Sequence, residues 1–161
     1  MKKTLLTIVT MCLVVVFLSA YSENPSGMKL GNVAPNFKVS DSQESLELYK
    51  LEGNYVLLSF WNSVDAESRI ANLQYDRAMR EMEGVSFVAV NFDSSYGVYQ
   101  EILKNDALDA ESQFYGWGNG GESFFNRYEL RRGMKALLLD KSGKILAENP
   151  SPSEIRMLIG E

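Results

Sequence analysis

Short apolar runs alternate with amphipathic stretches along most of the chain. Residues 55–60 (YVLLSF) and 85–92 (VSFVAVNF) are almost entirely apolar, which is typical of strands buried on both faces. Between them, from about Asp65 to Glu83, apolar residues recur at helical spacing. Strands that alternate with helices in this order predict an α/β fold, in which helices cover both faces of a central sheet.

The remaining predicted elements are shorter. A turn at 141–144 (KSGK) joins two apolar runs into a hairpin, so the sheet is predicted to be mixed rather than wholly parallel. Residues 45–49 alternate in period two and fit a short edge strand. The last helix has Ser151 or Ser153 as its N-cap. The other elements are strands over 36–39, 135–140 and 145–148 and helices over 96–104, 122–130 and 153–159.

The first 20 residues have the pattern of a secretory signal. Lys2 and Lys3 precede a 14-residue apolar run, 5–18, and the segment ends with Ser19 and Ala20. The run is short for a membrane span, which needs ~20 residues, although an uncleaved N-terminal anchor stays open as an alternative. We therefore predict an exported protein of the periplasm or cell envelope.

The sequence pattern divides the chain into three segments. A signal peptide over 1–20 precedes a polar stretch with Pro and Gly, 21–29, which is predicted to be a flexible leader. The rest of the chain has no internal repeat and no second block of different composition. One domain is therefore predicted over 30–161, with no membrane span once the signal is cleaved.

Two residue types are missing from the predicted mature chain. Cys12, inside the predicted signal, is the only cysteine, and the sequence has no histidine. These absences exclude Cys or His nucleophiles, Ser-His-Asp triads and zinc sites of the Cys/His type. Removal of Lys2 and Lys3 changes the net charge from −5 to −7. An acidic domain without a basic block is a poor match for nucleic acid or an anionic membrane surface.

Three segments, in order and spacing, resemble a known family. They are 31–37 (GNVAPNF), 56–61 (VLLSFW) and 128–144 (YELRRGMKALLLDKSGK). Together they resemble the thioredoxin-like extracytoplasmic thiol-disulfide oxidoreductases of the TlpA/ResA type, to which the AhpC/TSA peroxiredoxins are related. The resemblance implies a thioredoxin-like fold, with a central mixed sheet flanked by helices on both faces and a C-terminal hairpin and helix.

The resemblance also locates a redox site, and this chain departs from it. The family carries a W-x-x-W-C-x-x-C-type loop after the second of these segments, and counting from Trp61 places the two cysteines at Asp65 and Ser68. The family's cis-proline falls at Met134, after Gly133. Dithiol exchange needs two sulfurs, so we predict that it is absent here. The cis bond is expected to be absent with the proline, because a non-proline cis bond costs ~3 kcal/mol.

The replacing residues have a structural interpretation and a chemical one. Asp65 is predicted to cap the helix, whose unpaired N–H groups favour a carboxylate, and Glu67 in the first turn adds a smaller favourable term. Alternatively, Asp65 and Glu67 act as general acid and base, or hold a divalent cation, with Asp93 as a further neighbour. Ser68 has no His to activate it. We predict no metal and no cofactor.

A glycine-rich loop, 114–121 (FYGWGNGG), is the last candidate. It does not match the dinucleotide fingerprint; it is either a connector with Trp117 on the core or a binding ledge.

We predict a redox-inactive binding or scaffold module for an envelope protein or peptide. The alternatives are an enzyme of carboxylate-based chemistry and an accessory to a cysteine-bearing redox partner. The expected binding residues are Trp61, Asp65, Gly133, Met134 and Trp117.

Overall fold

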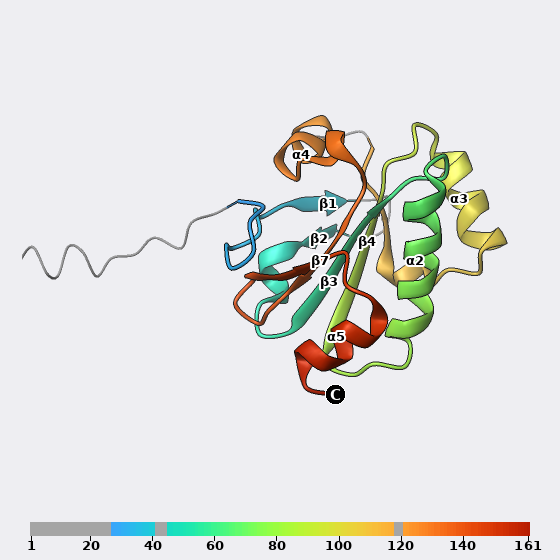
Figure 1. Cartoon of the computed structure of the whole chain (residues 1–161). Helices are drawn as coiled ribbons and strands as arrows, with labels where there is room; N and C mark the ends of the chain where they lie inside the picture. The colour runs from blue at the N-terminus through green and yellow to red at the C-terminus, as the bar shows by residue number, and fades with distance from the viewer. Residues whose placement is uncertain (1–26, 41–44, 118–120) are drawn as a thin grey trace, which may run out of the picture.

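A computed structural model describes residues 27–40, 45–117 and 121–161 (Figure 1). The predicted signal peptide, 1–20, lies outside the described residues. The strands are β1 (Lys38–Ser40), β2 (Ser45–Glu47), β3 (Tyr55–Trp61), β4 (Val85–Asn91), β5 (Gln113–Tyr115), β6 (Ala136–Leu139) and β7 (Ile145–Glu148). The α-helices are α2 (Ala66–Met79), α3 (Tyr96–Asn105), α4 (Gly121–Arg127) and α5 (Pro152–Ile159). None of the described helices is long and apolar enough to cross a bilayer.

The central sheet is mixed, as the sequence predicts. Its strand order is β5-β4-β3-β6-β7. β3, β4 and β5 are parallel, whereas β6 is antiparallel to β3 and forms the predicted hairpin with β7. A separate antiparallel pair, β1 and β2, precedes this sheet. Because parallel strands end at one edge, the loops after β3, β4 and β5 lie together there.

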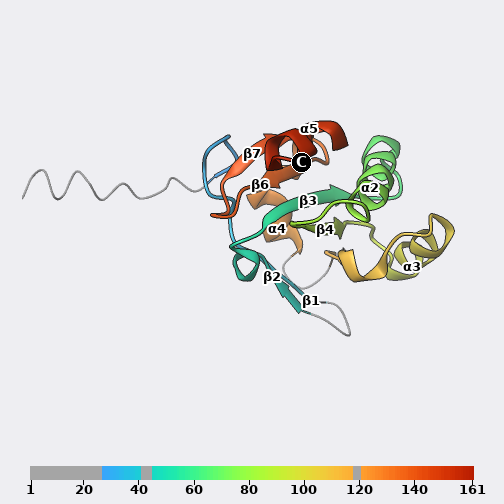
Figure 2. The same cartoon turned by 90° about the horizontal axis from the view of Figure 1, so that it is seen from below.

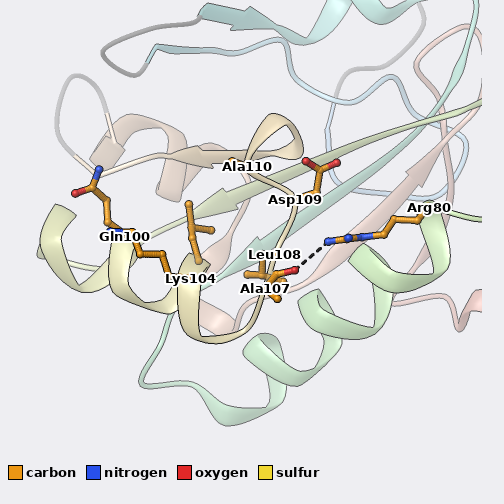
Figure 3. Close-up of a pocket in the computed structure, with 8 residues that line it drawn as sticks. Arg80, Gln100, Lys104, Ala107, Leu108, Asp109 and Ala110 are labelled. Atoms are coloured by element: carbon orange, nitrogen blue, oxygen red, sulfur yellow. Dashed lines mark hydrogen bonds between the residues drawn. The ribbon is translucent and has the colours of Figure 1, made fainter.

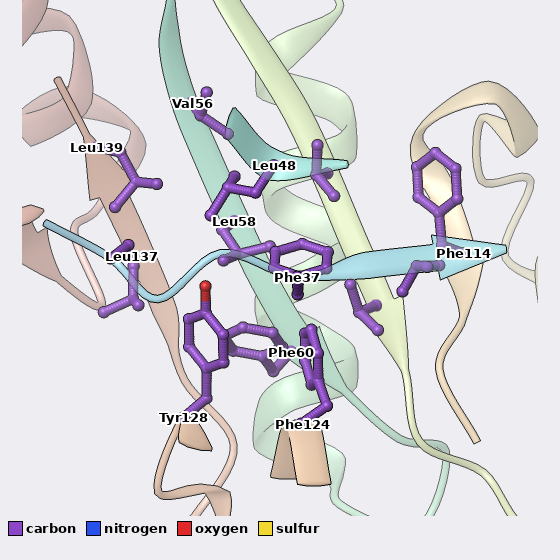
Figure 4. Close-up of a cluster of buried hydrophobic side chains, with 14 of the residues drawn as sticks. Phe37, Leu48, Val56, Leu58, Phe60, Phe114, Phe124, Tyr128, Leu137 and Leu139 are labelled. Carbon is purple, nitrogen blue, oxygen red and sulfur yellow. The ribbon is translucent and has the colours of Figure 1, made fainter. Parts of the chain in front are cut away.

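The two faces of the sheet are covered differently (Figures 1 and 2). Alternate side chains of β3 point to opposite faces, so Val56, Leu58 and Phe60 share one core, while Leu57 and Trp61 belong to the other. The first core packs under β1, β2 and α4, and Figure 4 shows its aromatic part. The second lies under α2, α3 and α5. Helices therefore flank both faces, and the predicted α/β class is confirmed.

The ends of several elements differ from the predicted ones. The helix predicted to reach Glu83 ends at Met79, because Arg80 is its C-cap and the chain then turns through Gly84. The segment predicted to begin a glycine-rich loop contains β5, whose three residues pair with β4. Such a short strand has no periodic signal of its own, since its pairing depends on a partner distant in the sequence.

The fold also begins earlier than predicted. The Gly27 N–H donates to the Val33 carbonyl, and Met28 packs against the first core. The last three residues of the predicted flexible leader, 27–29, are therefore part of the domain. The preceding part of that leader, 21–26, lies outside the described residues.

Candidate functional site

The loop between β3 and α2 ends in a helix cap. Asp65 has extended backbone geometry, and its Oδ1 accepts from the N–H groups of Glu67 (3.1 Å) and Ser68 (3.2 Å). This is an N-cap arrangement, worth ~1 kcal/mol relative to alanine. Glu67 lies in the first turn, where the helix dipole favours its charge. The prediction that Asp65 caps the helix is confirmed.

Ser68 is also held by local hydrogen bonds. Its side chain is buried, and its hydroxyl donates to the Asp65 carbonyl (3.1 Å) and accepts from the Asn62 N–H (3.4 Å). Asn62 in turn accepts from the Asp65 N–H through its side-chain oxygen (2.8 Å). No base contacts the hydroxyl in these interactions, so the geometry gives Ser68 a structural role and no activation as a nucleophile.

Asp93 lies next to this loop, at the end of β4. Its Oδ1 accepts from both the N–H and the hydroxyl of Ser63, each at 2.8 Å, and its Oδ2 accepts from the Asn91 amide (2.9 Å). The carboxylate is buried, and these bonds fix the loop that leads to Asp65. Within the described ranges, no group of three or more Cys, Asp or Glu side chains is arranged to hold a metal ion.

Trp61 does not reach the surface, which corrects the expectation that it lines the binding site. It is fully buried, and its indole N–H donates to the Gln113 side-chain oxygen (3.1 Å). The pleat of β3 turns Trp61 toward the face under α2 and α3, opposite to Phe60. Its side chain therefore supports the fold from inside.

The other expected residues are more accessible. Trp117 is half-exposed (49%) in the segment after β5, and the rest of its loop, 118–120, lies outside the described residues. Met134 is half-buried against the first core, next to Gly133, whose φ is 137°. Every peptide bond in the described ranges is trans, including the one before Met134, as predicted.

Gly116 explains part of the glycine-rich loop. A Cβ on this residue would lie 2.5 Å from Val90 Cγ1 and 3.2 Å from the Asn91 carbonyl oxygen. These distances are shorter than van der Waals contact, so this glycine allows the chain to pass close to β4. Close packing accounts for Gly116 without a ligand.

A groove of about 460 Å³ opens beside the start of α2, and we call it the α2–α5 groove. It contains Glu67, Ser68 and Met134, which the sequence analysis singled out, but not Asp65, Trp61, Gly133 or Trp117. The groove is lined by Ser59, Phe60, Glu67, Ser68, Ala71, Gln74, Tyr75, Met134, Lys135, Ala136, Asn149, Pro150, Ser151, Pro152 and Glu154.

Two hydrogen bonds hold the walls of the α2–α5 groove in place. The Tyr75 hydroxyl donates to the Pro150 carbonyl (2.9 Å), which ties α2 to the segment before α5. Burial, and to a lesser extent the nearby charge of Glu154, raise the pKa of Tyr75, so this donor keeps its proton. Asn149 accepts from the Ala136 N–H (2.7 Å). This wall, at the start of α5, was not predicted from the sequence, although the Ser151 N-cap of α5 is a local sequence signal.

Two other hollows lie away from the α2–α5 groove. One, of about 580 Å³, lies between the ends of α2 and α3, where Arg80 donates to the Ala107 carbonyl (Figure 3). The other, of about 400 Å³, is mostly apolar and lies between Leu48 and Leu139. Neither contains a residue that the sequence analysis expected in a site.

The arrangement of sheet and helices matches known structures. The crystal structure of a thioredoxin-like protein from Parabacteroides distasonis superposes with a TM-score of 0.73 and 26% identity, over 84% of this chain and 98% of that one. The chain has the thioredoxin-like fold of the thiol-disulfide oxidoreductases. The thioredoxin domain of a thiol-disulfide oxidoreductase from Bacteroides vulgatus shares this fold, with a TM-score of 0.70 and 19% identity over 83% of this chain and 97% of that one.

The sequence comparison agrees with this thioredoxin-like fold. The thiol-disulfide oxidoreductase ResA of Halalkalibacterium halodurans is 24% identical over 149 residues, which cover 91% of this chain and 82% of that protein. No family model matches the chain. In this thioredoxin-like chain, the first turn of α2, Met134 and the start of α5 lie around one groove.

Proposed function

We propose that this protein is an exported thioredoxin-like module of the cell envelope with a degenerate redox site, which binds an extended protein segment in the α2–α5 groove. The observation that carries the proposal is the state of the two expected cysteine positions. Asp65 and Ser68 are both engaged in the helix cap, while the groove beside them is open. The chain after the predicted signal has no cysteine with which to exchange disulfides.

The shape and chemistry of the groove favour binding. A groove of about 460 Å³ with Met134, Ala71 and Tyr75 on its walls offers apolar contacts together with backbone polar groups. Its walls are fixed by hydrogen bonds between distant segments, so little ordering is needed when a partner binds. Export is supported by the signal-like first 20 residues.

The carboxylate-based alternative has less support in the site. Asp65 Oδ1 caps α2, and the buried Asp93 carboxylate accepts from Ser63 and Asn91, so both carboxylates have structural roles. Glu67 therefore lacks the Asp65 partner with which it was expected to divide the roles of acid and base. If the partner were a cysteine-bearing redox protein, this chain would be its accessory. The identity of the captured partner distinguishes that case.

A larger side chain that fills the groove is expected to abolish binding of the partner. The chain from residue 21, which contains every described residue, is immobilised and used to capture proteins from the envelope fraction of its own cell. We expect wild type and Ile70→Phe to retain the same partner and Ala71→Phe to lose it, because Ala71 lines the groove whereas neighbouring Ile70 is exposed outside it. Trp61→Ala is unsuitable as a control, because removal of this buried ring disturbs folding.

Two results of the capture experiment would contradict the proposal. One is a partner set that Ala71→Phe retains in full, and the other is a wild-type chain that captures nothing beyond the background of a blank resin. Thermal midpoints of both variants show whether they are folded, so a loss of binding in a folded Ala71→Phe chain reports on the groove.

A further inference from the structure

The charged residues that line the α2–α5 groove without an ion-pair partner among the described residues are acidic. Glu67 comes from the first turn of α2 and Glu154 from the first turn of α5, so two separate helices each contribute an acidic residue to the lining of the same groove. Neither carboxylate forms an ion pair with another described residue. The one cation that lines the groove, Lys135, is largely buried and pairs with Glu148 (3.7 Å), which lies outside the lining.

Glu154 is held in place and has a free oxygen. Its Oε2 accepts from the Ser151 N–H (2.7 Å) and from the Ser151 hydroxyl (2.8 Å). These bonds lower the pKa of Glu154, so it stays ionised at neutral pH. Both bonds end on Oε2, and Oε1 has no hydrogen-bond donor among the described residues. That oxygen is available to an N–H group from outside the chain.

Apolar side chains form part of the walls beside these carboxylates. Ala71 and Tyr75 come from α2, Met134 precedes β6, and Pro150 and Pro152 flank the start of α5. Apolar walls with carboxylates at the rim match a side chain that has an alkyl stem and a cationic end. An acidic segment would meet two like charges in the same groove, and like charges disfavour association.

On the basis of the proposed function, we infer that the segment bound in the α2–α5 groove presents a lysine or arginine side chain to Glu67 and Glu154. The alkyl stem packs between α2 and the Met134 loop, and the cation meets the two carboxylates. The inference names a class of partner, an extended protein segment with an apolar and basic sequence.

Heptapeptide pools test this preference. Each pool has Lys, Arg, Gln or Glu fixed at the centre and the other positions randomised, and each is titrated by fluorescence anisotropy into the chain from residue 21 at low salt. We expect the Lys and Arg pools to bind at least about fivefold tighter than the Gln pool, since two exposed ion pairs contribute modestly. The Glu pool should bind most weakly, and added salt should reduce the difference.

Charge-removing variants assign the preference to the two carboxylates. Glu67→Gln and Glu154→Gln should each reduce the preference for Lys over Gln, and the double variant should abolish it. Gln at the third helical position still completes the Ser151 capping box, so Glu154→Gln keeps the local fold. Glu101→Gln, on α3 and outside the groove, is the matched control and should leave the preference unchanged.

The outcomes separate this inference from the proposed function. Equal binding of the Lys and Gln pools, with both lost in Ala71→Phe, would overturn the charge preference and leave the groove as the binding site. A preference that persists in the double variant would also overturn it. Binding that Ala71→Phe does not affect, or no binding by any pool, would contradict the proposed function as well.

Discussion

Gln113→Ala is expected to lower the free energy of unfolding by about 3 kcal/mol. The Gln113 side-chain oxygen accepts from the Trp61 indole N–H (3.1 Å) and from the Asn72 amide (3.2 Å), and all three side chains are buried. Truncation leaves two buried donors without an acceptor and opens a cavity under α2. The Gln113 amide nitrogen has no partner among the described residues, so its removal offsets part of this cost.

Urea denaturation of the chain from residue 21 measures this loss, and Gln100→Ala on exposed α3 is the matched control. A change of less than about 1 kcal/mol in Gln113→Ala would be in the range of ordinary surface substitutions. Such a result would mean that the hydrogen bonds from Trp61 and Asn72 to Gln113 do not hold Trp61 in the core. The exclusion of Trp61 from the proposed binding surface would then lose its physical basis.

The double substitution Asp65→Cys/Ser68→Cys is expected to create a working dithiol. Both residues lie at the start of α2, and the Asp65 side-chain Oδ1 accepts from the Ser68 N–H at 3.2 Å, so the sulfurs of two cysteines there should be within reach of each other. The helix N-terminus favours a thiolate at position 65. Loss of the cap should destabilise the reduced variant by ~1 kcal/mol.

Thiol titration and insulin reduction measure the outcome. The double variant should lose its reactive thiols on oxidation, regain both on reduction and reduce insulin measurably, although Met134 in place of proline should keep the rate low. Wild type from residue 21, and each single variant, should show no catalytic turnover. A folded double variant that keeps two free thiols under oxidising conditions would show that the β3–α2 loop does not have redox-loop geometry.

Local signals account for what the sequence predicted well. The buried strands β3 and β4 have long apolar runs, the KSGK turn specifies its hairpin, and Asp65 caps α2 through bonds to residues only two and three positions away. These features depend on short-range chemistry. The three segments that resemble the family predicted the fold, because their order and spacing extend over most of the chain.

Long-range contacts account for what the sequence did not predict. Period-two alternation places Phe60 and Trp61 on opposite faces of β3, but it does not say which face lies under α2. The α5 wall of the groove depends on the Tyr75–Pro150 hydrogen bond, whose partners are 75 positions apart. The proposed binding surface therefore lies between α2 and the start of α5 and does not include Trp61.

Amide chemical-shift mapping with the tightest-binding heptapeptide locates the binding site on the folded chain from residue 21. We expect the largest shifts to cluster on 67–75, 134–136 and 149–154, the segments that line the α2–α5 groove beside the capped helix. Shifts confined to the hollow between α2 and α3, or to the one between Leu48 and Leu139, would contradict this expectation.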